Sequence, residues 1–268
     1  MTATVRRAYA DYRHGQLHYR IAGPMDADRT PLMCFHLSPV SGVIYENLLT
    51  EVGRDRLAVA PDNPGFGGSD PPPSPPTIGD YAKVMGELAD SLGLGSVDVI
   101  GYHTGAKIGI ELSIQRPELV RRLVLVSTPV YSDEELARQH ATLGKPSWFD
   151  EGGAHLLEVW DGHWEWRGPD QTIEMVHQTV AEVFRAGSRA WWGHRAAFEY
   201  QMGDRLPLVT HRTLVLCPHD DLLEPTRRSE PLIQNGRLLE LPGWGHGMMD
   251  LHTERFASII RQFLDGEG

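Results

Sequence analysis

Short apolar runs and longer amphipathic segments alternate along most of the chain. The runs have strand length and strand-like composition, and they lie at Leu32 to His36, Leu57 to Ala60, Val97 to Ile100, Leu123 to Ser127, Thr213 to Cys217 and Arg237 to Leu241. The amphipathic segments have apolar residues at helical spacing and span Tyr45 to Val52, Ile78 to Leu92, Thr104 to Gln115, Glu224 to Gln234 and Thr253 to Leu264. This alternation predicts an α/β fold with a mainly parallel, twisted sheet and helices on both faces.

Two segments in the first third of the chain depart from this alternation. The strand-like stretches Val5 to Asp11 and Gln16 to Ala22 flank His14-Gly15, so we expect an antiparallel hairpin there. The proline-rich segment Pro71 to Pro76 predicts a stiff, extended surface loop.

The alternation breaks between Pro129 and about Pro207. This stretch contains no convincing strand, yet it holds six of the seven tryptophans. It predicts a helical lid of residues 130–206 over a core domain formed by residues 1–129 and 207–268. A lid so rich in tryptophan favours an apolar or aromatic substrate. The candidate contacts are Trp148, Trp160, Trp164, Trp191 and Trp192.

Composition and charge favour a soluble protein that acts on a small molecule. The formal charge of −11 disfavours nucleic acid and anionic membranes as partners. The start lacks a signal-like apolar stretch and no segment reaches the roughly 20 apolar residues of a membrane span, so we expect a cytoplasmic protein. The spacing of His155, His163 and His194 does not suit a metal site, and we expect no metal or cofactor. Monomer and homodimer both stay open.

A five-residue motif at the end of one predicted strand marks the candidate active site. Gly101-Tyr102-His103-Thr104-Gly105 has the spacing of G-x-S-x-G, the sharp strand-to-helix turn that presents a catalytic serine. Histidine occupies the serine position. The turn forces its central residue into a strained conformation with positive φ, which histidine tolerates better than most residues. We therefore expect His103 to project into a pocket that lacks a serine nucleophile.

Further polar motifs follow other predicted strands. They are His36-Leu37-Ser38-Pro39, the glycine-rich turn Pro61 to Asp70, the pair Asp220-Asp221, and Gly245-His246-Gly247. Ligands of open parallel sheets bind outside the carboxyl ends of the strands, so these motifs should meet at one edge. The chain order of elbow, acid and histidine is that of a hydrolase triad on this topology.

With these motifs the chain resembles the α/β-hydrolase superfamily over nearly its full length, from Leu17 to Phe263. The most telling stretches are Asp62 to Asp70, the elbow, Arg121 to Ser127 and Leu241 to His246. The resemblance implies an α/β-hydrolase fold with a helical cap between strands six and seven. It also implies that His246 is the triad histidine. Asp221 is the implied acid, because Pro225 follows four residues later, and Asp220 is the alternative.

The same resemblance implies an oxyanion hole, formed by the main-chain N–H groups of Ser38 and Thr104. The chain departs from the family pattern at His103 and at Leu37, which replaces the usual glycine after His36. We expect His36 and Leu37 to lie at the substrate, with His36 shaping the oxyanion loop by hydrogen bonding.

Lys107 is expected to be solvated or ion-paired, or alternatively to pair with a substrate carboxylate.

The chemistry of the histidine elbow stays open between three alternatives. A neutral imidazole is nucleophilic without a partner that deprotonates it, so His103 could form an acyl-imidazole. Alternatively, His103 and His246 form an acid and base pair, with Asp221 holding His246 in one tautomer. Either would suit cleavage of an ester, a lactone or a carbon–carbon bond, and the second would also suit a lyase. The third alternative is a degenerate pocket that binds ligands without catalysis.

Overall fold

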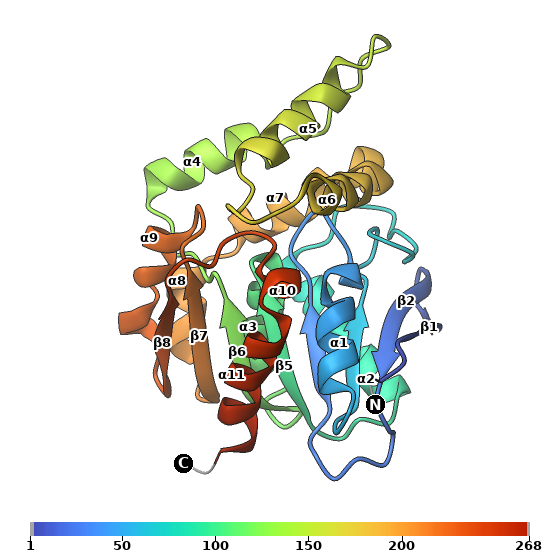
Figure 1. Ribbon diagram of the computed structural model, residues 1–268, viewed down its shortest axis with the longest axis vertical. Helices are drawn as coiled ribbons and strands as arrows, with labels where there is room; N and C mark the ends of the chain where they lie inside the picture. The colour runs from blue at the N-terminus through green and yellow to red at the C-terminus, as the bar shows by residue number, and fades with distance from the viewer. Residues whose placement is uncertain (1–2, 267–268) are drawn as a thin grey trace.

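The computed structural model describes residues 3–266 and shows an eight-stranded sheet between layers of helices (Figure 1). The strand order is β1-β2-β4-β3-β5-β6-β7-β8; β1 and β2 pair antiparallel, as do β2 and β4, and the remaining pairs are parallel. The strands are β1 (Arg6–Tyr12), β2 (Gly15–Ala22), β3 (Leu32–Phe35), β4 (Ala58–Pro61), β5 (Val97–Tyr102), β6 (Val120–Val126), β7 (Arg212–Pro218) and β8 (Gly236–Leu241). The predicted fold class and the N-terminal hairpin are confirmed.

Helices cover both faces of the sheet. On one face lie α2 (Ile78–Ser91) and α3 (Thr104–Gln115), and on the other lie α1 (Glu46–Val52) and α11 (Thr253–Asp265). The central strand β5 shows why: all six of its residues are buried, and its side chains alternate between the two apolar clusters. A strand buried on both faces is predominantly apolar, and the one charged residue of β5, Asp98, is paired with Arg56 and Arg121.

A helical insertion between β6 and β7 forms the cap. It contains α4 (Asp133–Thr142), α5 (Ala154–Glu165), α6 (Ile173–Ala186), α7 (Trp191–Glu199) and α8 (Met202–Arg205). In Figure 1, α6 and α7 lie directly above the sheet, and α4 and α5 form an outer layer. The burial pattern agrees, because α6 buries Val176, Val180 and Val183 along one face, whereas α4 and α5 contain no buried residue.

One helix expected from the sequence is wrong, and one helix was not anticipated. The segment Glu224 to Gln234 is not one helix: α9 (Leu223–Arg227) ends early, and a separate 3-10 turn spans Glu230–Leu232. Pro231 lies in this turn, and a proline lacks an N–H donor and disfavours helical geometry in the residue before it. The chain also forms a short helix, α10 (Met248–Leu251), that the apolar pattern did not indicate.

The proline loop, the two cysteines and the lengths of the helices complete the local structure. Pro71 to Pro76 forms a largely exposed loop without helix or strand, as predicted. Cys34 and Cys217 are buried, free thiols. None of the helices within residues 3–266 is both long and apolar enough to cross a bilayer.

The elbow glycines are required by close approaches of backbone atoms. A Cβ atom on Gly105 would lie 1.9 Å from the Phe35 carbonyl oxygen, and one on Gly101 would lie 2.3 Å from the Gly105 carbonyl oxygen. Only a residue without a Cβ lets α3 begin this close to β3 and β5.

This packing predicts that Gly105→Ala lowers the free energy of unfolding by about 3 kcal/mol, because backbone must move to admit the methyl group. Gly162→Ala is the matched control, since Gly162 is also helical but a Cβ there has no neighbour within 4 Å. That substitution should raise the free energy of unfolding by about 0.5–1 kcal/mol. Urea denaturation of the two variants measures both values, and equal effects would contradict this account of the elbow.

Candidate active site

His103 sits at the turn between β5 and α3 in a strained backbone conformation. Its φ and ψ are 48° and −107°, and its N–H donates to the Val126 carbonyl oxygen at 3.0 Å. The side chain is 17% exposed, so the imidazole can be reached from solvent. The structure therefore presents His103 where the elbow geometry of a catalytic serine would place the nucleophile.

A second strained residue lies at the end of the neighbouring strand. Ser127, directly after β6, has φ of 49°, and apart from His103 it is the only residue other than glycine with positive φ among residues 3–266. Its hydroxyl donates to Oδ2 of Asp220 at 2.6 Å, and His103 Nε2 lies 3.5 Å from the same oxygen. The two strained residues thus point at one carboxylate, as is typical of functional sites.

Asp220 is fixed in place by these contacts and by its own backbone. Its Oδ1 accepts a hydrogen bond from the Leu222 N–H at 2.9 Å, and its side chain is fully buried. A buried carboxylate with three partners holds a defined orientation. Sequence reasoning ranked Asp220 only as a fallback for Asp221 and missed Ser127 altogether. The signal that could have identified Ser127 is its position directly after β6, at the carboxyl end of a parallel strand.

His246 has a separate carboxylate partner. Its Nε2 lies 2.7 Å from Oδ1 of Asp221, and the side chains are 26% and 32% exposed. Asp221 follows β7 and His246 follows β8, so neighbouring parallel strands deliver the pair to one edge of the sheet. The predicted proximity of Asp221 and His246 is present in the structure.

The imidazole rings of His103 and His246 lie close together in a T-shaped arrangement. The ring centroids of His103 and His246 are 5.9 Å apart, and the ring planes make an angle of 77°. Each ring uses Nε2 toward its own aspartate, which leaves Nδ1 of each as the nitrogen available to a ligand. The site therefore contains two imidazole–carboxylate pairs, where a serine triad contains one.

The contacts between the histidines and the aspartates shift the pKa values of these side chains. Burial alone would raise the pKa of Asp220 and of Asp221, but the contacts and charges of His103 and His246, together with the Ser127 hydrogen bond to Asp220, outweigh it. Both pKa values are therefore lowered, and both carboxylates stay ionised. Burial opposes the charged form of His246 as well, but its bond to Asp221 prevails and raises the pKa of His246 above its usual value. His246 is thus a stronger base than an isolated imidazole.

The oxyanion loop follows β3 and is shaped by His36. His36 is fully buried; its Nε2 accepts from the Asn63 N–H at 2.9 Å, and its Nδ1 lies 2.7 Å from the Leu37 carbonyl oxygen. The expected loop-shaping bonds are present, but a direct substrate contact is not available to a ring with both nitrogens engaged below the surface. Leu37 is half-buried and packs against the apolar cluster of α1 and α11.

Ser38 and Thr104, the residues expected to form an oxyanion hole, follow β3 and β5 respectively. Thr104 is the first residue of α3, and N–H groups of a first helical turn have no partner within the helix. Ser38 is buried, is followed by a cis peptide bond to Pro39, and its hydroxyl has no hydrogen-bond partner among the described residues. Donors of this kind stabilise negative charge on a carbonyl oxygen.

The cap helix α7 reaches the oxyanion loop through Gly193 and His194. A Cβ on Gly193 would lie 1.9 Å from the Ser38 hydroxyl oxygen, so helix and loop are in close contact. His194 faces the Ser38 backbone, and burial together with the charge of His103 lowers the pKa of His194 to about 4. It is therefore a neutral imidazole at the site. Sequence reasoning considered His194 only as a metal ligand and missed this position.

The tryptophans of the cap differ in their placement. Trp192 packs over Gly65 of the loop after β4, and Trp160 stacks on Trp164 with ring centroids 6.1 Å apart. Trp191 is half-buried on α7. Trp148 is a correction: it is 47% exposed, and its indole N–H donates to Glu158 at 3.1 Å. It belongs to the loop between α4 and α5, at the tip of the cap farthest from the sheet (Figure 1), so it does not approach His103.

Two aspartates fix the glycine-rich turn after β4 through hydrogen bonds to backbone N–H groups. Asp62 is buried and accepts hydrogen bonds from the N–H groups of Gly42 and Gly68, each at 2.8 Å. Asp70 accepts from the N–H of Gln16 at 2.8 Å. Lys107 is a further correction, because it is buried and donates to the Ala197 carbonyl oxygen at 2.6 Å, and within the part of the chain that the structure describes it forms no ion pair.

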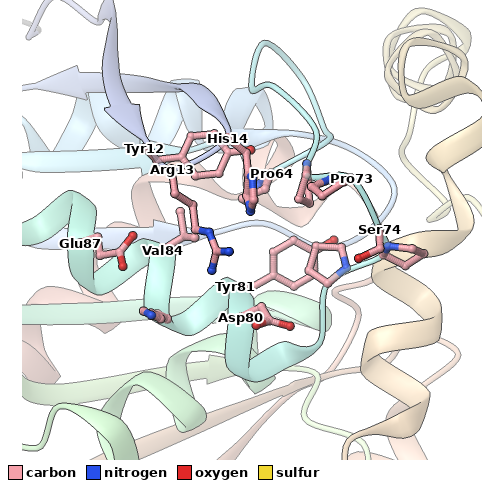
Figure 2. Close-up of a pocket in the computed structure, with 14 residues that line it drawn as sticks. Tyr12, Arg13, His14, Pro64, Pro73, Ser74, Asp80, Tyr81, Val84 and Glu87 are labelled. Atoms are coloured by element: carbon pink, nitrogen blue, oxygen red, sulfur yellow. The ribbon is translucent and has the colours of Figure 1, made fainter.

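A cavity of about 200 Å³ lies away from these groups, between the proline loop, the β1–β2 turn and α2. Figure 2 shows the Arg13 guanidinium pointing into the space between Tyr81 and Glu87. Its lining contains neither His103 nor His246, and its charged side chains of both signs are half-exposed or exposed. It is therefore separate from the candidate active site.

Comparisons with known proteins agree with this layout. A family model described as alpha/beta hydrolase fold matches residues 30–165. The chain is 28% identical over 250 residues to a 2-hydroxymuconate semialdehyde hydrolase of Pseudomonas sp. (strain CF600), covering 87% of this chain and 86% of the relative. It is 26% identical to a putative carbamate hydrolase RutD of Caulobacter vibrioides, covering 93% and 96%.

A solved structure supports the fold independently. A hydrolase from Pseudomonas aeruginosa PA01 superposes with a TM-score of 0.80 at 20% identity, over 98% of this chain and 99% of that one. Both sequence relatives share most of their length with this chain, and the family model covers half of it. The chain belongs to the α/β hydrolase fold family.

Proposed function

We propose that the protein is a hydrolase that cleaves an ester, a lactone or a carbon–carbon bond next to a carbonyl group, in a small and largely apolar substrate. The observation that carries the proposal is the pair of imidazole–carboxylate contacts, His103 with Asp220 and His246 with Asp221, across 5.9 Å. The relatives named above are hydrolases by description. The tryptophans that α5 and α7 carry support an apolar substrate.

The geometry favours acid and base chemistry on a bound water molecule. His246 accepts a proton from water through Nδ1, and the water oxygen bonds to the substrate carbonyl carbon. The N–H of Thr104 and the Ser38 loop stabilise the resulting oxyanion. The bond to the leaving group then breaks, and the leaving group takes a proton from Nδ1 of His103. His246 then releases the proton it took from water, and His103 takes up one proton, which restores both rings. Ionised aspartates orient both rings and stabilise the charge that forms on them.

The proposal is tested by assaying the purified protein against a panel of aryl esters, lactones and vinylogous diketones while intact-protein mass spectra are recorded. We expect turnover of at least one class without a covalent adduct. An acyl adduct on His103 would replace the acid–base assignment by covalent catalysis and leave the hydrolase intact. Saturable binding without turnover of any class would contradict the hydrolase itself.

The raised pKa of His246 predicts the pH dependence of turnover. A general base must be neutral, so kcat/KM should fall as the pH drops through the pKa of His246, which lies above its usual value near 6.5. Asp221→Asn removes the bond that raises this pKa, and the acid limb should move to lower pH while the maximal rate falls. A pH–rate profile of both proteins checks this, and an unmoved limb would show that another group controls it.

A further inference from the structure

A buried lysine lies at the two connections between the core and the cap. Lys107 is one turn beyond the elbow on α3 and is 2% exposed, yet it has no carboxylate partner among residues 3–266. Its amine donates to the Ala197 carbonyl oxygen in the last turn of α7, and lies 5.6 Å from the centre of the Tyr131 ring. An ammonium group has three donors, so most of its hydrogen-bonding capacity is unused.

Lys107 lines a cavity of about 140 Å³. Pro129, Val130 and Tyr131 come from the chain that leaves β6 for the cap, and residues 200–204 come from the chain that returns toward β7. Leu136 of α4 and Met202 of α8 add apolar surface. A cavity of about 150 Å³ in another protein holds a benzene molecule, so the volume suits a ligand with a single ring.

We propose that this cavity binds a small monocarboxylate, whose oxygens accept hydrogen bonds from Lys107 and whose hydrocarbon part packs against Pro129, Leu136 and Met202. A buried cation without a counter-ion is unfavourable, and an anionic ligand supplies the missing partner. The site would join the segments that enter and leave the cap. It is distinct from the candidate active site, because neither His103 nor His246 lines this cavity.

The charge of Lys107 makes this binding dependent on pH. Burial lowers the pKa of Lys107 to about 7, so its charged form is scarce at alkaline pH. A carboxylate pairs with the charged form, so binding above pH 7 must take up a proton. Burial raises the pKa values of Tyr131 and Tyr200 far above this range, and Glu111 is paired with Arg205. Besides Lys107, Asp204 is the only charged residue among the described residues that line the cavity. The facing helices also carry charged or titratable groups: Asp133, Glu134, Glu135, Arg138 and His140 on α4, and His194, Arg195 and Glu199 on α7.

Calorimetric titration of the full-length protein with benzoate tests the proposal. We expect saturable binding of one benzoate per chain at this site, weakening by about 30-fold between pH 6 and pH 8.5, with uptake of nearly one proton at pH 8.5. Lys107→Met should weaken binding at least tenfold at pH 6 and remove the Lys107 contribution to the pH dependence. Asp204→Asn, which removes an exposed carboxylate from the lining, should strengthen binding about twofold. Lys83→Met is the matched control at an exposed lysine and should leave binding unchanged.

The alternative is that Lys107 only clamps α3 to the C-terminal end of α7, where a cation is favourable. In that case Lys107→Met lowers the melting temperature, and benzoate binds the natural protein without saturation or without proton uptake. Either result overturns the proposal, and so does equal benzoate affinity of the folded Lys107→Met variant. If that variant does not fold, proton uptake by the natural protein, measured in two buffers of different ionisation enthalpy, decides alone.

Discussion

His246→Ala is expected to lower kcat/KM for the hydrolysed substrate by about 10³-fold, the largest effect of any single substitution. The variant loses the base that is paired with Asp221 at 2.7 Å. It also leaves the partly buried Asp221 carboxylate without the imidazole that can carry a positive charge beside it. A 10³-fold loss corresponds to about 4 kcal/mol of transition-state stabilisation. Steady-state kinetics at the pH of maximal turnover measure it.

His211→Ala is the control for this experiment. His211 is also a histidine with a hydrogen bond, from Nε2 to the Pro117 carbonyl oxygen at 3.0 Å, but it precedes β7 and so lies at the opposite end of that strand from Asp221. Its removal should leave kcat/KM within about twofold of the natural protein. If His246→Ala retains full turnover while folded, the proposed base is wrong.

His103→Ala is expected to lower kcat by about 10²-fold with a smaller change in KM, because the lost imidazole acts on the leaving group and contributes little to ground-state binding. Asp220→Asn should act in the same direction by about tenfold, since it keeps the volume of the side chain but removes the ionised partner of His103. The two effects should not multiply in the double variant, because Asp220 acts through His103. Kinetics of the three variants on one substrate check this.

Ser113→Ala is the matched control for the Asp220 contacts. Ser113 is a buried serine of α3 whose hydroxyl donates to the Ile110 carbonyl oxygen at 2.7 Å, away from the carboxylates. It should leave kcat unchanged, whereas Ser127→Ala should reproduce part of the Asp220→Asn effect.

Full activity of His103→Ala would show that the elbow histidine has only a structural role.

The periodicity of the chain was sufficient to predict the sheet and most of its helices. The alternation between β5 and the flanking amphipathic segments is strong because the strands of a parallel sheet covered on both faces are buried along their length and predominantly apolar. The failure at Glu224 to Gln234 has a local cause, the proline at position 231, which an apolar pattern does not register.

The candidate site was only partly predictable. Motif spacing was enough to bring Asp221, His246 and the elbow together, because parallel strands end at one edge. The second carboxylate pair was not predicted, since it depends on the backbone conformation of Ser127 and on which of two adjacent aspartates faces His103. The role of His194 depends on how the cap helix packs on the oxyanion loop, which local sequence does not determine.

A double-mutant cycle between His103 and His246 tests the central claim most directly. If the two imidazoles serve the same bond cleavage, then kcat/KM of the His103→Ala, His246→Ala double variant should lie within about tenfold of the His246→Ala value. If each histidine acts independently, the two losses multiply and the double variant falls by about 10⁵-fold instead. That multiplicative result would contradict a shared acid and base pair at the histidine elbow.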